Sequence, residues 1–281
     1  MTNELGPGVA PVVWAPGMHT GSDGSVDLVA YDRYLGRWSR LFVPALVEAA
    51  GIGRGDRVLD VATGPGDAAI AVLSIVGGGG LVIGCDIATG MAHAAHQRSG
   101  GTLAVVAADG QQLPFRNDTF DAVICQLGLM FFPRPDEALV EFARIARPAG
   151  RVAVAVLSTP ERAAMWGVLA RVLSDHLPDQ HKAFHLSFSL ADPGMVIELF
   201  TRAGYRDVQV QRHVRDSVFE SLDDYWEPIE RGMGSLPHAY CSLPETVRRR
   251  VHDEVNDILS AYRDGDRLVM SVEALIAAGH R

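Results

Sequence analysis

The segment that decides the fold is RVLDVATGPGDAAIAV, residues 57–72. Its first part, RVLDVA, is a short apolar run of the kind that forms a strand buried on both faces of a sheet. Glycines follow at positions 64 and 66, where they let the backbone turn tightly and approach a ligand without a Cβ in the way. A helical pattern over 67–76 comes next. The segment therefore predicts a strand, a glycine-rich turn and a helix in direct succession.

The same alternation of apolar runs and helical patterns continues along the chain. Repeated strand–helix alternation is typical of a mostly parallel sheet with helices on both faces. We therefore predict an α/β fold with a doubly wound, mostly parallel, seven-stranded sheet. The expected strands are 57–62, 81–86, 103–109, 121–127, 151–158, 207–214 and 267–279, and the expected helices between the first five of them are 67–76, 89–98 and 135–146.

Several segments outside this alternation are expected to cover the sheet. Residues 1–25 hold many Gly and Pro and predict a flexible leader, or a segment that orders over the functional site. Residues 26–50 follow a helical pattern. We assign 1–50 to an N-terminal leader and lid helix, and 51–281 to the main domain with lid insertions at about 160–190 and 221–263.

The composition disfavours several classes of protein. A net charge of -9 over 281 residues disfavours a nucleic-acid partner, because such affinity comes largely from Lys and Arg that neutralise phosphates. The three cysteines form no Cys-x-x-Cys pair, which fits a reducing cytosol. The N-terminus lacks a basic region ahead of an apolar core, and no apolar stretch reaches the roughly 18 residues of a membrane helix. We expect a cytoplasmic protein without membrane insertion; a homo-oligomer remains open.

The glycine turn alone leaves the ligand open. Gly64-x-Gly66-x-x-Ala69 also satisfies the loose dinucleotide fingerprint of NAD(P)-dependent oxidoreductases. Asp86 ends the second expected strand about 20 residues further on, where a carboxylate can accept both ribose hydroxyls of an adenosine. However, Asp60 stands four residues before Gly64, and Asp109 ends the third strand, where it could accept from an adenine amino group. The dinucleotide fingerprint asks for neither carboxylate, which favours a different adenosine cofactor.

Four segments together resemble the class I S-adenosylmethionine-dependent methyltransferases, in particular the ubiquinone and menaquinone type. The likeness is closest over about residues 26–160, and Ala62 and Ala149 stand where that family usually has glycine. The resemblance implies binding of S-adenosylmethionine, release of S-adenosylhomocysteine, and methylation of an O, N or C atom of a small, hydrophobic or aromatic metabolite. The segments are LDVATGPGD (59–67), GCDIATGMAHAA (84–95), AADGQQLPFRNDTFDAVICQLGLMFF (107–132) and EFARIARPAGRVAV (141–154).

The resemblance also implies a set of cofactor-binding residues. Asp86 would hold the ribose, and Arg37 with Tyr31 and Tyr34 would meet the methionine carboxylate, unless Tyr34 is an ordinary core residue. The others divide by the part of the cofactor that they would contact. These are Asp60, Ala62, Gly64 and Gly66 for the methionine part, Ile87 and Met91 for the adenine face, Asp109 and Gly110 for the adenine edge, and Gln126 and Leu127 beside the sulfonium.

The sequence marks the catalytic and substrate-contacting residues less clearly than the cofactor-binding residues. A general base is needed only when the nucleophile must lose a proton, and histidine titrates near neutral pH. His176, His181 and His185, in the insertion after the fifth strand, are therefore the candidate bases. Phe131, Phe132, Trp166, Phe184 and Phe188 are candidates to line an apolar substrate pocket. His93 and His96 have no third ligand at matching spacing, so we expect no metal.

Alternatives to a small-molecule methyltransferase differ in what they leave unexplained. An NAD(P)-dependent oxidoreductase would give Asp60 and Asp109 no role. A nucleic-acid methyltransferase is disfavoured by the acidic charge. A protein that binds S-adenosylmethionine for a non-methylating reaction, or only binds a ligand, would carry the same cofactor loops, because function depends on the site rather than on the fold.

Overall fold

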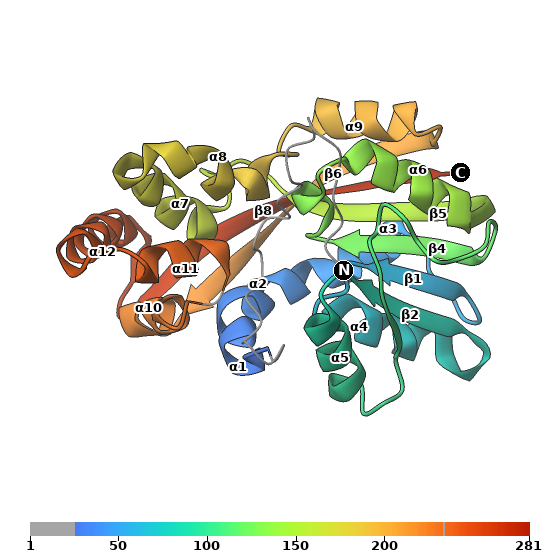
Figure 1. The fold of residues 1–281 in the computed structure, drawn as a ribbon, viewed down its shortest axis with the longest axis horizontal. Helices are drawn as coiled ribbons and strands as arrows, with labels where there is room; N and C mark the ends of the chain where they lie inside the picture. Colours follow the sequence, from blue (N-terminus) through green and yellow to red (C-terminus); the bar gives the residue numbers. More distant parts are fainter. Residues whose placement is uncertain (1–25, 233) are drawn as a thin grey trace, which may run out of the picture.

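An eight-stranded mixed sheet organises the part of the chain that the computed structural model describes, residues 26–232 and 234–281. The strand order is β3-β2-β1-β4-β5-β8-β6, and the short β7 pairs with β8. The first five strands run parallel, and β8 is antiparallel to both of its long neighbours (Figure 1). The strands are β1 Arg57–Val61, β2 Leu81–Asp86, β3 Ala104–Ala107, β4 Phe120–Gln126, β5 Ala146–Leu157, β6 Arg206–Phe219, β7 Arg263–Asp264 and β8 Arg267–His280.

Helices cover both faces of this sheet because successive strand residues point to opposite sides. Along β4, Ala122 and Ile124 belong to the core under α3, α4 and α5, while Val123 and Cys125 belong to the core under α6 and α9. The helices of these two layers are α3 Val43–Ala49, α4 Asp67–Val76, α5 Thr89–Arg98, α6 Pro135–Ile145 and α9 Pro193–Arg202, with the short turns η3 Gly77–Gly79 and η4 Leu129–Phe131.

A second group of helices packs around the far ends of the long strands β6 and β8 (Figure 1). In this group α7 contacts α12, α11 and β8, and α10 contacts α11. We call it the helical cover. It consists of α7 Ala164–His176, η5 Pro178–Gln180, α8 His181–Phe184, η6 Leu186–Phe188, α10 Leu222–Glu230, α11 Ser235–Cys241, α12 Glu245–Leu259 and η7 Ser260–Tyr262.

The helical pattern at 26–50 is not one regular helix. Pro44 at the start of α3 has no N–H to donate, so a helix cannot run through it unbroken. The preceding residues form short α, π and 3₁₀ turns that contact α10 and β6. We call α1 to η2 the N-terminal segment; it consists of α1 Leu28–Tyr31, η1 Asp32–Gly36, α2 Arg37–Ser39 and η2 Arg40–Phe42.

The predicted fold class is confirmed. All seven expected strands are present, but β6 extends to Phe219 and the two-residue β7 is additional. Among the described residues no helix has both the length and the apolar character needed to cross a bilayer, and no group of three potential metal ligands occurs. The leader predicted at residues 1–25 lies outside the described residues.

Candidate active site

A cavity of about 390 Å³ opens at the carboxyl ends of β1, β2 and β4. The chain builds outward from β1 to β3 and then returns to the other side of β1 with β4, so the strand order reverses here. Open α/β sheets bind ligands in the crevice at such a reversal. The walls come from four sources: strand ends and the turns that follow them (Asp60, Ala62, Thr63, Gly64, Asp86, Ile87, Ala88, Gln126, Leu127, Gly128, Leu157), α4 and α5 (Asp67, Ala68, Met91), the N-terminal segment (Tyr31, Leu35, Trp38, Ser39), and η4 with the helical cover (Met130, Phe131, Phe132, Trp166, Ser187, Ser235).

The glycine turn after β1 brings main chain to the cavity wall. Gly64 has φ +54° and Gly66 has φ +90°, the left-handed region that glycine adopts without strain. Gly64 lines the cavity, but Gly66 does not. A Cβ at position 66 would lie 3.0 Å from the Cβ of Ala95, so this glycine lets α4 approach α5. Gly66 therefore shapes the turn, and its contact with a ligand stays a prediction.

Asp86 holds that turn in place from the end of β2. Its Oδ2 accepts the Gly64 N–H at 2.8 Å, and its Oδ1 accepts the Ala88 N–H at 2.9 Å. Burial raises the pKa of Asp86, although these backbone N–H groups oppose the rise. Each carboxylate oxygen can accept a second hydrogen bond, so Asp86 keeps capacity for hydroxyl groups in the cavity.

Asp60 is the most deeply buried charged group of the cavity, with 1% of its surface exposed. Its Oδ2 accepts from the Thr63 hydroxyl at 2.7 Å and from the Ala69 N–H at 3.1 Å. Its Oδ1 is buried without a hydrogen-bond partner among the described residues. Burial raises the pKa of Asp60 to about 7. A positively charged or N–H-donating ligand would supply the hydrogen bond that Oδ1 of Asp60 lacks.

Gln126 and Leu127 line the cavity from the end of β4. The Gln126 side-chain amide donates from Nε2 to the backbone oxygen of Ser39 at 2.6 Å, which leaves Oε1 buried without a partner in the described part of the chain. Leu127, Ile87, Met91 and Ala62 also line the cavity, in agreement with the positions chosen for them.

Asp109 and Gly110 do not line the cavity. The Asp109 carboxylate accepts the Gln111 N–H at 2.8 Å and so caps its own turn. Gly110 packs against Phe132, where a Cβ would lie 2.7 Å from Cζ of the ring. Because Phe132 itself lines the cavity, it separates this turn from the space. A direct contact of Asp109 and Gly110 with the cofactor therefore stays a prediction.

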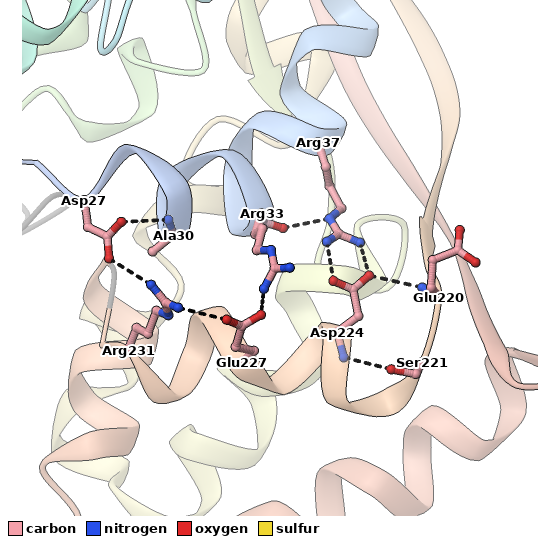
Figure 2. A network of polar contacts seen from close by, with 9 residues as sticks. All are labelled: Asp27, Ala30, Arg33, Arg37, Glu220, Ser221, Asp224, Glu227 and Arg231. Carbon is pink, nitrogen blue, oxygen red and sulfur yellow. Dashed lines mark hydrogen bonds and ion pairs between the residues drawn. The ribbon is translucent and has the colours of Figure 1, made fainter.

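Arg37 also has a different place from the predicted one. Its guanidinium makes two hydrogen bonds of 2.7 Å to the Asp224 carboxylate on α10 (Figure 2). It also lies 4.4 Å from the Phe219 ring centroid. It does not line the cavity. Tyr34 is buried with 1% exposure and packs on Trp166 at 5.2 Å between ring centroids, so it is a core residue. Of the three residues chosen in this segment, Tyr31 alone lines the cavity.

The three candidate bases lie outside the described cavity lining, and a catalytic role for them stays a prediction. His176 pairs with Glu254 at 3.0 Å, and His181 stacks on His185 with 4.0 Å between ring centroids. No histidine belongs to the described lining. Of the proposed apolar wall, Phe131, Phe132 and Trp166 face the cavity, whereas Phe184 and Phe188 are buried in the core beside it.

Residues 59–154 match the family model of a methyltransferase domain. The match runs from β1 into β5 and includes the strand ends that carry Asp60, Asp86 and Gln126. These residues carry a methyltransferase domain. The methyltransferase predicted from the sequence resemblance is thereby confirmed.

Known proteins agree with this methyltransferase domain. Demethylmenaquinone methyltransferase of Mycobacterium marinum is 37% identical over 147 residues, which cover 52% of this chain and 58% of the relative. The solved structure of the YcgJ protein of Bacillus subtilis matches with a TM-score of 0.58 at 18% identity, over 85% of this chain and 97% of that one. Phosphoethanolamine N-methyltransferase 2 of Haemonchus contortus, solved with phosphomonomethylethanolamine and S-adenosylhomocysteine, gives 0.57 at 17% identity, over 90% of this chain and 56% of that one. The chain spans little more than half the length of the curated relative.

Several lining residues around the methyltransferase domain were not predicted. Leu35, Trp38 and Ser39 follow Tyr31 at helical spacing, so periodicity offered a signal for them. Ser187 and Ser235 come from separate parts of the helical cover, and no local pattern marks either of them.

Proposed function

We propose that the protein is an S-adenosylmethionine-dependent methyltransferase of a small molecule. The observation that carries the proposal is one cavity with two strand-end carboxylates, Asp60 and Asp86, on either side of the Gly64 turn. The methyltransferase-domain match over these residues supports it, as does the quinone methyltransferase among the relatives.

The lining fits this cofactor part by part. Asp86 would accept the ribose hydroxyls, and Ile87 with Met91 would pack on the adenine. The unpartnered Oδ1 of Asp60 would accept from the methionine ammonium, since a buried acceptor needs a donor. When bound, the cofactor supplies a methyl group on a sulfonium, which is already activated for transfer.

The protein's own residues would then contribute by positioning the nucleophile and by excluding water. In-line displacement needs the nucleophile held at about 3–3.5 Å from the methyl carbon. The wall formed by Phe131, Phe132 and Trp166 would orient a flat apolar molecule, and the cover would keep water out. With no histidine, lysine or arginine in the described lining, these residues act by orientation rather than by strong base catalysis.

We further propose that the N-terminal segment and the insertions at about 160–190 and 221–263 form the lid of this site. Tyr31 and Ser39 reach the cavity from the first, Trp166 and Ser187 from the second, and Ser235 from the third. The net charge of -9 supports a small-molecule partner over nucleic acid, and we propose a cytoplasmic location.

The test is calorimetric titration with S-adenosylmethionine, S-adenosylhomocysteine and NADH. We expect both sulfur compounds to bind, NADH not to bind, and Asp86→Ala to weaken binding about 100-fold, because two ribose hydroxyls lose a buried partner. The control Asp136→Ala removes an exposed carboxylate on α6 and should change nothing.

The outcomes separate the candidate functions. Binding of NADH alone would overturn the proposal in favour of an oxidoreductase. Tight binding of S-adenosylmethionine, with no methyl transfer in a broad screen of small acceptors, would indicate a non-methylating protein of the same fold.

A further inference from the structure

Trp166 carries a buried N–H group that no described residue satisfies. Only 5% of its surface is exposed, and its Nε1 has no hydrogen-bond partner in the described part of the chain. The indoles of Trp38 and Trp226 are satisfied, by the Tyr34 backbone oxygen at 3.0 Å and by Asn256 Oδ1 at 2.7 Å. An indole N–H can only donate, so Trp166 needs an acceptor that the described protein does not provide.

The Trp166 ring packs against two aromatic rings at the cavity wall. Its centroid lies 5.2 Å from that of Tyr34 and 6.4 Å from that of Trp38, the latter nearly edge-on at 75°. Trp166 lines the cavity, and so does Ser39, whose hydroxyl is also buried without a partner among the described residues. Both residues therefore contribute to the cavity wall, and each carries a buried polar group without a partner among the described residues.

The charges of the cavity restrict what can bind there. The charged side chains of the described lining are the carboxylates of Asp60, Asp67 and Asp86, and no lysine, arginine or histidine belongs to it. A phosphate or carboxylate on the substrate would be desolvated without a counter-charge. Trp166 belongs to one hydrophobic cluster with Leu35, Met130, Leu157 and the two phenylalanines, all of which line the cavity. An uncharged aromatic molecule is the best match.

We propose that Trp166 determines substrate specificity by donating its indole N–H to a neutral oxygen of an uncharged aromatic substrate, with Ser39 as the second polar contact. The proposal rests on the proposed methyltransferase function, since it concerns the acceptor half of the same cavity. This arrangement would favour substrates that carry a carbonyl or hydroxyl oxygen over substrates that carry a phosphate.

The experiment uses Trp166→Phe, which keeps an aromatic ring and removes the N–H. The full chain, loaded with S-adenosylhomocysteine, is titrated calorimetrically with 2-naphthol, naphthalene and 2-naphthyl phosphate. We expect wild type to bind 2-naphthol most tightly, and Trp166→Phe to weaken that binding about tenfold while naphthalene binding stays unchanged. Trp226→Phe loses an N–H away from the cavity and serves as the matched control.

Nuclear magnetic resonance spectroscopy of the indole N–H protons provides an independent readout. The Trp166 signal, assigned by its loss in Trp166→Phe, should move downfield with 2-naphthol, and the Trp226 signal should not. Equal 2-naphthol affinity in wild type and Trp166→Phe, tighter binding of the phosphate, or no binding of 2-naphthol to wild type would each overturn the proposal. Failure of S-adenosylhomocysteine to bind wild type would instead overturn the proposed function, and the same naphthol titrations of the unloaded protein would still decide the role of Trp166.

Discussion

At the scale of single residues, Asp60 shows how burial prepares a carboxylate for a cationic ligand. Burial raises the pKa of Asp60 to about 7, so in the free protein its charge is lost as the pH falls below neutrality. The proposed partner, the methionine ammonium, needs the ionised form. Because the proton must leave before the ion pair forms, cofactor affinity should fall with pH below 7 and level off above it.

We therefore predict S-adenosylhomocysteine affinity about tenfold weaker at pH 6 than at pH 8, measured by calorimetry. Asp60→Asn should bind more weakly and give a flatter profile, since its amide does not titrate. The pKa of Asp86 is also raised by burial, so the profile that remains in this variant reports Asp86. A wild-type affinity that is independent of pH would show that Asp60 does not face the ammonium.

At the scale of elements, a ladder of ion pairs joins the N-terminal segment to α10 (Figure 2). Arg33 pairs with Glu227, Arg37 with Asp224, and Arg231 with both Glu227 and Asp27. The Arg37–Asp224 pair is the best shielded of these, with 18% and 20% of the two side chains exposed. The Arg37 guanidinium lowers the pKa of Asp224, so this pair stabilises the fold above the ordinary pKa of Asp224 and is lost as the pH falls through its lowered value.

Asp224→Asn should therefore lower the free energy of unfolding by about 1–2 kcal/mol at neutral pH, because it leaves a partly buried guanidinium without its counter-charge. Urea unfolding measures this loss. The control Glu198→Gln breaks an exposed pair with Arg202 and should change stability by less than about 0.5 kcal/mol. Equal effects of the two variants would contradict a stabilising role for the Arg37–Asp224 pair.

The same elements show what a sequence can and cannot predict here. Asp60, Asp86 and Gln126 were predictable because parallel strands end at one edge of a sheet, which brings their last side chains together. Arg37 was not, because its partner Asp224 is 187 residues away and no periodicity links the two positions. The contacts of the histidines were not predictable for a related reason: His176 pairs with Glu254 of α12, and His181 stacks on His185.

At the scale of the whole molecule, the long strands β6 and β8 carry the cover. Each has 14 residues, and they pair from Arg206 opposite His280 to Phe219 opposite Leu268, while the parallel strands β1 to β4 are shorter. The part of β8 that pairs with β5 completes the methyltransferase sheet, and its other end contacts α7. β8 thus links the sheet, whose strands β1, β2 and β4 end at the cavity, to the helical cover, which also contributes residues to the cavity lining.

That arrangement predicts where a bound cofactor will slow amide hydrogen exchange. Protection by S-adenosylhomocysteine should appear at the Gly64 turn and also in α1, α2 and the start of α7, because Tyr31, Ser39 and Trp166 line the same cavity. Helices α6 and α9 contribute no residue to the described lining and serve as internal controls that should keep their free-state rates. Mass spectrometry of peptides from free and loaded protein measures this. Protection confined to residues 59–91 would mean that cofactor binding alone does not order the cover, and would refute its assignment as the lid over the cofactor.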